Sequence, residues 1–211
     1  RFLDQNLAAG FDLFHKDVNQ TTGNVFRNRK TGGSLRLGFP LSEALWINTN
    51  YTLSFDEIYD VDKDFSDGRV ASRAIREAEG SVVTSSVGAS MTFDQRNHPR
   101  NPNSGYYLQL AADVAGAGGD VQYVRVVGEG RAYQPITEKI FLVGRVMGGI
   151  IEGWGGDDIR LLDMFYKGGE TVRGFGKAGY GPRDLSTGDA LGGTTFWSAT
   201  AEIRFPLPLI P

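Results

Sequence analysis

The side chains that most often carry catalysis or bind metals are scarce in this chain of 211 residues. It has no Cys and two His, His15 and His98. Without Cys there is no thiol nucleophile, thiolate metal site or disulfide. Neither His has an identifiable nucleophile for a Ser-His-acid arrangement. We therefore expect no catalytic residue, no metal ion and no cofactor, and we predict that the chain is not an enzyme.

Two short patterns suggest ligand binding but have the wrong context. Gly174, Gly176 and Gly179 match the G-x-G-x-x-G spacing of dinucleotide-binding loops, but they follow a Gly-Gly turn and precede Gly-Pro rather than joining a strand to a helix. The Asp-rich turn 60–64 lacks the Gly and the terminal Glu of an EF-hand loop. The formal net charge of −3 offers no basic face, so we expect no nucleic-acid partner.

Two charged segments, 94–105 and 163–184, have more distinctive compositions. The first, DQRNHPRNPNSG, is rich in turn-forming residues, and the second combines glycines and aromatic residues with Arg173. A planar guanidinium can make two parallel hydrogen bonds to a carboxylate, which Lys cannot reproduce. From the residues alone, the simpler interpretation of Arg173 is an exposed loop arginine.

The elements that must position these segments are long strands, because apolar and polar residues alternate along most of the chain. We expect eight strands, at about 6–16, 34–39, 45–56, 83–94, 106–114, 121–133, 140–151 and 195–205. Most exceed the usual 5–6 residues and approach the ~9–11 that cross a bilayer. Their polar faces are rich in Ser, Thr and Asn, whereas a soluble sandwich or lipocalin-like barrel, the alternative, favours charged exteriors. The pattern predicts an all-β, transmembrane antiparallel β-barrel.

The connections between these strands alternate in length. Those after odd-numbered strands include the long polar segments 17–33, 57–81 and 152–194, whereas those after even-numbered strands are short or rich in turn residues. Outer-membrane barrels show this parity, with long extracellular loops and short periplasmic turns. Within the second long loop, residues 70–79 fit either a short surface helix ended by Gly80 or a solvated loop.

Three ordered motifs resemble the outer-membrane insertase superfamily. Segment 168–175 resembles its Val-Arg-Gly-Phe loop motif, here Val172, Arg173, Gly174 and Phe175. Segment 94–105 resembles a turn motif, here Asp94, Arg96, Pro102 and Gly105. Segment 201–208 is similar to the strand that follows the motif loop, and the order and spacing agree over roughly the whole chain.

The resemblance implies a sixteen-stranded barrel, of which residues 1–211 would be a partial barrel domain of about eight strands. It also implies that the motif loop folds back into the lumen, where Arg173 pairs with Glu202 and with a second acidic residue on a following strand. The alternation agrees, because Glu202 lies on the polar face opposite Ile203 and Phe205. An eight-stranded barrel has no room for such a loop, since its own side chains fill it.

The function that the resemblance implies is the folding and insertion of nascent β-barrel proteins into the bacterial outer membrane. The implied partners are those nascent proteins, accessory assembly lipoproteins and outer-membrane lipid. Alternatives are a polypeptide-secreting pore of the same superfamily, a passive porin-like barrel and, least favoured, an outer-membrane enzyme. Because the register of strands 121–133 and 140–151 is ambiguous, Arg125, Glu129, Arg131 and Arg145 could either face the lumen or form a mutual surface network.

Overall fold

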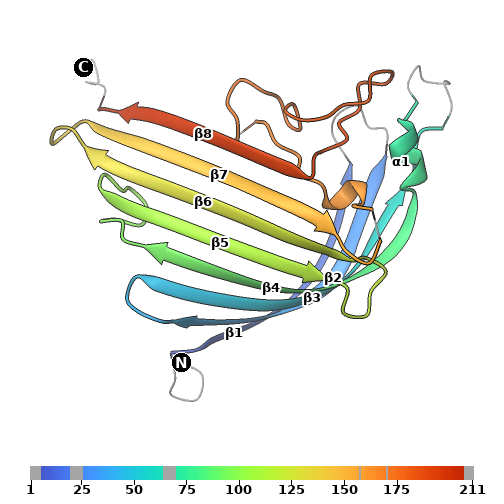
Figure 1. Ribbon diagram of the computed structural model, residues 1–211, viewed down its shortest axis with the longest axis horizontal. Helices are drawn as coiled ribbons and strands as arrows, with labels where there is room; N and C mark the ends of the chain where they lie inside the picture. The colour runs from blue at the N-terminus through green and yellow to red at the C-terminus, as the bar shows by residue number, and fades with distance from the viewer. Residues whose placement is uncertain (1–5, 20–25, 64–69, 157, 170, 207–211) are drawn as a thin grey trace.

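A computed structural model describes residues 6–19, 26–63, 70–156, 158–169 and 171–206. Within them, eight strands form one antiparallel sheet in the order β1 to β8, each paired with its neighbours in sequence (Figure 1). The strands are β1 (Ala8–Asn19), β2 (Arg27–Pro40), β3 (Leu45–Tyr59), β4 (Gly80–Asp94), β5 (Gly105–Ala115), β6 (Tyr123–Pro135), β7 (Phe141–Gly153) and β8 (Thr195–Arg204). The predicted all-β class and the eight strands are confirmed.

The sheet is strongly curved but is not closed into a ring (Figure 1). Among the described residues, β1 and β8 form its two edges. The structure therefore has the shape of a barrel wall rather than of a complete small barrel or a two-layer sandwich. No helix in the described part of the chain is long and apolar enough to cross a membrane.

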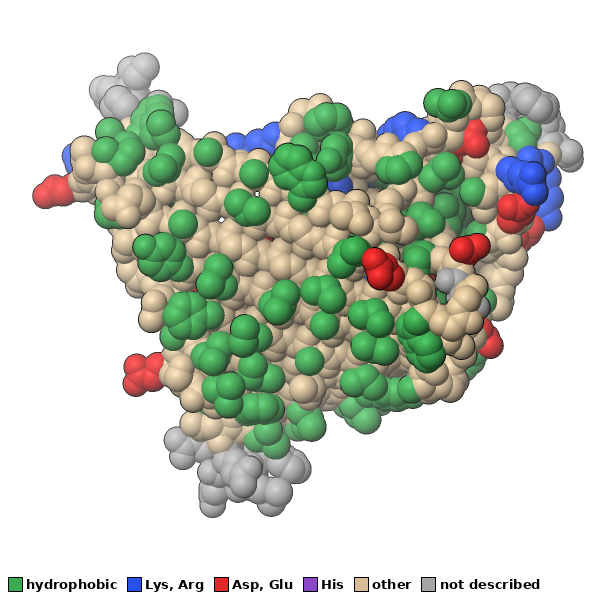
Figure 2. All heavy atoms as spheres, in the orientation of Figure 1, with side chains coloured by type: hydrophobic (Ala, Val, Ile, Leu, Met, Phe, Trp, Pro, Cys, Tyr) green, Lys and Arg blue, Asp and Glu red, His purple; other side chains and the backbone are tan. Residues whose placement is uncertain are grey.

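One face of the sheet is apolar and exposed. Phe11, Leu35, Tyr51, Val87 and Val114 lie in register across β1 to β5, and all five side chains are exposed. Figure 2 shows hydrophobic side chains spread over the molecular surface in this view. A water-soluble sheet would cover such a face with a second layer, because exposing it to water is unfavourable. A lipid environment removes that cost.

The apolar face ends at a charged border. On β3 it runs from Leu45 to Phe55, and the next outward residue, Glu57, lies in register with Arg29 and Asp17. Arg29 forms ion pairs with both carboxylates, at 3.4 Å to Asp17 and 3.3 Å to Glu57. This apolar span matches the strand length that crosses a bilayer, so the border marks the level of the lipid head groups.

The first predicted loop, 17–33, was too long. The structure continues β1 to Asn19 and begins β2 at Arg27, so that Asp17 and Arg29 are paired ladder residues. The ends of these strands lie beyond the lipid border and carry charged side chains. The alternation of apolar and polar residues therefore stops before the strands do. The connections after β3 and β7 remain long, from residue 60 to 79 and from residue 154 to 194.

The second long connection contains the short helix α1 (Arg73–Glu77), so the helical alternative for residues 70–79 was right. The Ser72 side chain accepts a hydrogen bond from the Ile75 N–H and caps its first turn. The helix ends at Glu77, with Ala78 as its C-cap, rather than at Gly80, which instead begins β4. It is not wholly superficial, because Ile75 is 1% exposed and belongs to a hydrophobic cluster described below.

Candidate functional site

Residues 154–194 are called the motif loop below, and those of them that the structure describes form a compact body that contacts the polar face of the sheet. The loop contains the short 3-10 helix η2 (Leu161–Asp163). Its two halves are joined by bridges from Phe165 to Gly193, from Lys167 to Tyr180 and from Arg183 to Ala190. In Figure 1 the loop lies beside β8 and reaches towards α1.

Arg160 ties the start of the motif loop to β3 and β4. Its Nη2 lies 3.5 Å from Asp56 Oδ2 and donates a 3.0 Å hydrogen bond to Thr84 Oγ1, while its Nε lies 2.8 Å from Asp163 Oδ2. The Asp56 side chain is 3% exposed and also pairs with Lys30 at 3.1 Å. Lys30, Asp56 and Thr84 lie on the polar face of β2, β3 and β4. Through them, Arg160 joins the motif loop to three strands that are distant from it in the chain.

A hydrophobic cluster packs next to the contact between Arg160 and Asp56. Its buried members come from three connections and from the end of β3, and they are Phe26, Ile58, Val61, Ala71, Ile75 and Leu161. Leu161 is the contribution of the motif loop, directly after Arg160. Because these side chains share one core, the loops at this end of the sheet pack as a unit.

Aromatic contacts attach the loop to β8. The Phe165 and Phe196 rings meet edge to face with centroids 4.7 Å apart. Lys167 Nζ lies 3.9 Å from the Phe196 ring centroid, in the position of a cation–π contact. Burial, together with the positive charge of Arg145, lowers the pKa of the Lys167 amine.

Tyr166 joins the two halves of the loop. Its hydroxyl donates towards the carbonyl oxygens of Leu161 and Leu191, at 3.0 and 3.3 Å. Burial raises the pKa of Tyr166 to about 12. The neutral phenol is therefore the form that the folded loop favours.

The structure brings Arg173 and Glu202 together. Arg173 Nη2 lies 2.7 Å from Glu202 Oε1, and the other carboxylate oxygen accepts from Nε and Nη2 of Arg204, at 3.2 and 3.1 Å. Arg204 directs two N–H groups to this single oxygen and Arg173 directs one to the other, so neither arginine makes the two parallel hydrogen bonds that a guanidinium allows. The Arg173 side chain is 77% exposed and Glu202 is 19% exposed, so this pair is not a buried ion pair.

The rest of the loop motif shapes a tight turn. Gly174 has φ +89°, a left-handed conformation that favours glycine. The Gly169 N–H donates to the Phe175 carbonyl oxygen, and the Phe175 ring contacts the Tyr180 ring edge to face with centroids 5.8 Å apart. Val172 is half-buried in this turn. The motif thus presents the Arg173 side chain from a turn that its neighbours define.

The turn motif forms a second arginine site at the other end of the sheet. Arg96 makes the two-bond pairing with Asp94, from Nε to Oδ1 at 2.8 Å and from Nη2 to Oδ2 at 2.7 Å. This carboxylate raises the pKa of Arg96. Pro102 is buried, and Gly105 has φ +101° with the Gln95 carbonyl against its missing Cβ position. These four motif residues therefore build one turn.

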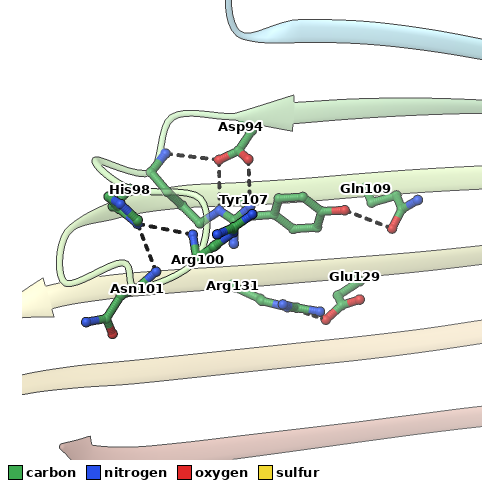
Figure 3. A network of polar contacts seen from close by, with 9 residues as sticks. Asp94, His98, Arg100, Asn101, Tyr107, Gln109, Glu129 and Arg131 are labelled. Carbon is green, nitrogen blue, oxygen red and sulfur yellow. Dashed lines mark hydrogen bonds and ion pairs between the residues drawn. The ribbon is translucent and has the colours of Figure 1, made fainter. Parts of the chain in front are cut away.

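Around this turn, polar contacts extend along the polar face (Figure 3). His98 Nδ1 accepts the backbone N–H groups of Arg100 and Asn101, so His98 has a structural role in the turn. The Tyr107 ring lies between two guanidinium groups, with Arg96 Cζ 4.8 Å and Arg131 Cζ 5.3 Å from its centroid. The turn is thereby linked to β5 and β6.

The four charged residues of uncertain register lie on the polar face and pair there. Glu129 Oε1 lies 2.6 Å from Nε of both Arg131 and Arg145, and Arg125 pairs with Asp113 at 3.1 Å. They therefore face the side of the motif loop and also form a largely mutual network. Among the described residues, no group of three or more His, Cys, Asp or Glu side chains could hold a metal ion.

Sequence reasoning missed three residues of the site, and one of them, Asp56, carried a usable signal. Asp56 is the last polar-face position of the predicted strand 45–56 and its one acidic residue there, which could have marked it as a contact point. Arg160 and Asp189 lie in loop sequence without a motif. Asp189 is 5% exposed, and its carboxylate accepts the Ser72 N–H at 2.7 Å.

Known proteins with similar sequences and folds cover the whole chain. A family model described as the Omp85 superfamily domain matches residues 1–211. The outer membrane protein assembly factor BamA of Neorickettsia risticii is 29% identical over 210 residues, which are 99% of this chain and 27% of that protein. Sorting and assembly machinery component 50 homolog A of Xenopus laevis is 32% identical over 210 residues, 98% of this chain and 43% of that protein.

A solved structure agrees with the fold. The crystal structure of BamA from Haemophilus ducreyi lacking POTRA domains 1–3 matches with a TM-score of 0.86 at 16% sequence identity, over 100% of this chain and 44% of that chain. Apolar outer face, polar inner face and curvature together define a section of an outer-membrane β-barrel protein. The chain belongs to the Omp85 superfamily. It spans about a quarter of the BamA relative and less than half of the component 50 relative.

Proposed function

We propose that this chain is part of the barrel of an outer-membrane protein assembly factor, which folds and inserts nascent β-barrel proteins into the outer membrane. The similar proteins carry the names of an assembly factor and of a sorting and assembly machinery component. A nascent barrel exposes unpaired strand edges, which are very costly in lipid. A protein that templates edge pairing and perturbs the bilayer lowers this barrier without covalent chemistry, so no enzyme activity is part of the proposal.

The observation that carries the proposal is that the motif loop contacts two well-separated strands of the curved sheet, β3 and β8. Arg160 reaches Asp56 on β3, while Phe165 and Arg173 reach Phe196 and Glu202 on β8. A loop tied to strands that are five places apart in the sheet braces the curvature between them. An assembly factor must keep its barrel intact while substrate strands add and leave, and such a brace serves that need.

Within this proposal, the motif residues have mechanical roles. Val172, Gly174 and Phe175 form the turn that presents Arg173 to Glu202, and the turn motif at 94–105 stabilises the opposite rim. The long connections are extracellular and the short turns periplasmic. Nascent barrel proteins are the substrates, accessory assembly lipoproteins are partners and outer-membrane lipid surrounds the apolar face.

The first test is Arg173→Ala in the full-length protein. We expect reduced assembly of substrate barrels and increased protease cleavage of the motif loop, because the tip loses its ion pair with the wall. Assembly is measured as the heat-modifiable fraction of a newly made barrel substrate. Arg76→Ala, at an exposed position of α1, is the matched control.

A charge exchange tests the pair itself. Arg173→Glu alone should impair assembly more than Arg173→Ala, because two carboxylates then face each other. Arg173→Glu combined with Glu202→Arg should recover part of the loss. If deletion of 163–184 left substrate assembly intact, a passive porin-like barrel would be the better interpretation. Polypeptide release without assembly would favour a secreting pore.

A further inference from the structure

We propose that Asp56 is a positioning residue that fixes the base of the motif loop to the polar face through Arg160, whereas the Arg173–Glu202 pair positions the tip alone. The base comprises residues 158–167 and 182–194, and the tip comprises the described residues 168, 169 and 171–181. The consequence for substrate assembly rests on the proposed function. The positioning role rests on the geometry of the described residues.

The Asp56 carboxylate is the most enclosed charge at the contact between loop and wall. It is 3% exposed and accepts from Thr84 Oγ1 at 2.8 Å and from Ser54 Oγ at 3.3 Å, in addition to its ion pairs with Lys30 and Arg160. Donors from three adjacent strands and from the loop thus meet at one carboxylate. A buried charge that is this well satisfied has little freedom to move.

Arg160 connects the Asp56 carboxylate to the motif loop. It is 20% exposed, and its guanidinium contacts two strand residues as well as Asp163 in η2. The next residue, Leu161, is buried in the hydrophobic cluster, and its carbonyl oxygen accepts from Tyr166. The other half of the base is held by Asp189, which accepts the backbone N–H of Ser72. The base is therefore held by several buried contacts, and the contact between Arg160 and Asp56 is the one that ties it to β3.

The tip is held far less firmly. Arg173 is 77% exposed and gives Glu202 a single hydrogen bond, while Arg204 competes for the same carboxylate. Solvent screens exposed ion pairs, and the long side chain must be ordered to form them. The tip can therefore leave the wall while the base stays in place, so that Asp56 and Arg173 control different parts of one loop.

The experiment measures loop position in the full-length protein by pairs of spin labels. This chain has no Cys, so labels are placed on introduced cysteines, with any other Cys of the full-length protein replaced by Ser. Leu185→Cys reports on the base and Lys177→Cys on the tip, each paired with Glu138→Cys in the turn between β6 and β7. Distance distributions are recorded for Asp56→Asn, Arg160→Gln and Arg173→Ala.

We expect Asp56→Asn and Arg160→Gln to broaden the Leu185–Glu138 distribution about twofold or more, because the base loses its fixed point. Arg173→Ala should broaden the Lys177–Glu138 distribution and leave the other unchanged. Asp12→Asn is the matched control, since Asp12 lies on the same face of β1 and pairs with Arg36 at 2.7 Å. Arg160→Gln keeps the wall contacts of Asp56 and so tests the inference even if Asp56→Asn fails to fold.

An unchanged Leu185–Glu138 distribution in folded Arg160→Gln protein would overturn the positioning role, whatever happens to assembly. A broadened distribution with normal substrate assembly would support the positioning role and contradict the bracing role that the proposed function gives to the motif loop. The two hypotheses therefore fail on different readouts.

Discussion

At the scale of single residues, two arginine–carboxylate pairs of this protein differ in geometry and therefore in strength. Arg96 is 13% exposed and makes two bonds to Asp94, with the Tyr107 ring against its guanidinium. Arg173 is largely exposed and makes one bond. Exposed pairs contribute about 0.2–1 kcal/mol, and hydrogen bonds to charged groups about 1.5–3 kcal/mol. The turn motif is thus the stronger structural element, and the loop motif is the one that can open.

Gly105 is the residue of the turn motif that a side chain would damage most. Gly105→Ala should lower the free energy of unfolding by more than about 1 kcal/mol, since φ is +101° and an added Cβ would collide with the Gln95 carbonyl oxygen. Urea unfolding followed by Trp fluorescence measures the change. Gly144→Ala, where an added Cβ meets nothing within 4 Å, is the control and should stay close to the unsubstituted protein.

At the scale of elements, the ionisation of Tyr166 should control the order of the motif loop at high pH. The folded pKa is raised from 10.0 to about 12, so the folded state keeps its proton at a pH where the unfolded loop has lost it. The stabilisation is complete below pH 10 and is lost as the pH rises through 12. We expect protease cleavage of the loop to increase over this range.

Tyrosinate absorbance measures the ionisation, and Tyr166→Phe is the control. The Phe variant lacks both hydrogen bonds to Leu161 and Leu191, so its loop should be more easily cleaved at neutral pH. Its cleavage should show no further step between pH 10 and 12. A Phe variant with the same step as the unsubstituted protein would show that another group is responsible.

The two faces of each strand should lose different amounts of stability when a charge is introduced. Leu110→Arg, on the exposed apolar face of β5, should lower the free energy of unfolding in lipid by about 2–4 kcal/mol, as for Arg near the bilayer midplane. Ala111→Arg, one residue further and on the polar face, should cost much less. Urea unfolding in lipid vesicles measures both. Equal losses would mean that the assignment of the lipid face is wrong.

At the scale of the whole molecule, the loops at one end act as a single body because they share a hydrophobic core. Ile75 of α1, Ile58 of β3, Phe26 before β2 and Leu161 of the motif loop are all buried in that cluster. Loops without such a core would move independently. Here a substitution in α1 should change the stability of the motif loop.

Ile75→Ala tests this coupling. The side chain is 1% exposed, so its truncation should cost about 2–5 kcal/mol of local stability and should loosen the motif loop. Cleavage of the motif loop by protease in the full-length protein is the measurement. Arg76→Ala, the next residue and exposed, should leave cleavage unchanged. If both variants behaved alike, the loops would not pack as one unit.

The sequence by itself determined that the chain forms eight strands, and it determined the two faces of four of them. Leu45 to Phe55 alternates with Trp46 to Asp56, and the structure places these two sets on opposite faces. The same agreement holds for 83–94, 106–114 and 195–204. Alternation is a local property of an extended backbone, so no knowledge of distant residues is needed. The motif residues were visible only through their resemblance to the outer-membrane insertase superfamily, since from the residues alone Arg173 is an ordinary loop arginine.

Apart from the Arg173–Glu202 pair, which the resemblance implied, tertiary structure decided which charges meet. The register of β6 and β7 determines that Glu129 pairs with Arg131 and Arg145, and the path of the motif loop determines that Arg160 reaches Asp56. It also decided that Glu202 shares its carboxylate between Arg173 and Arg204. An ion pair depends on where two side chains lie in space, and residues far apart in the chain carry no local pattern that records it.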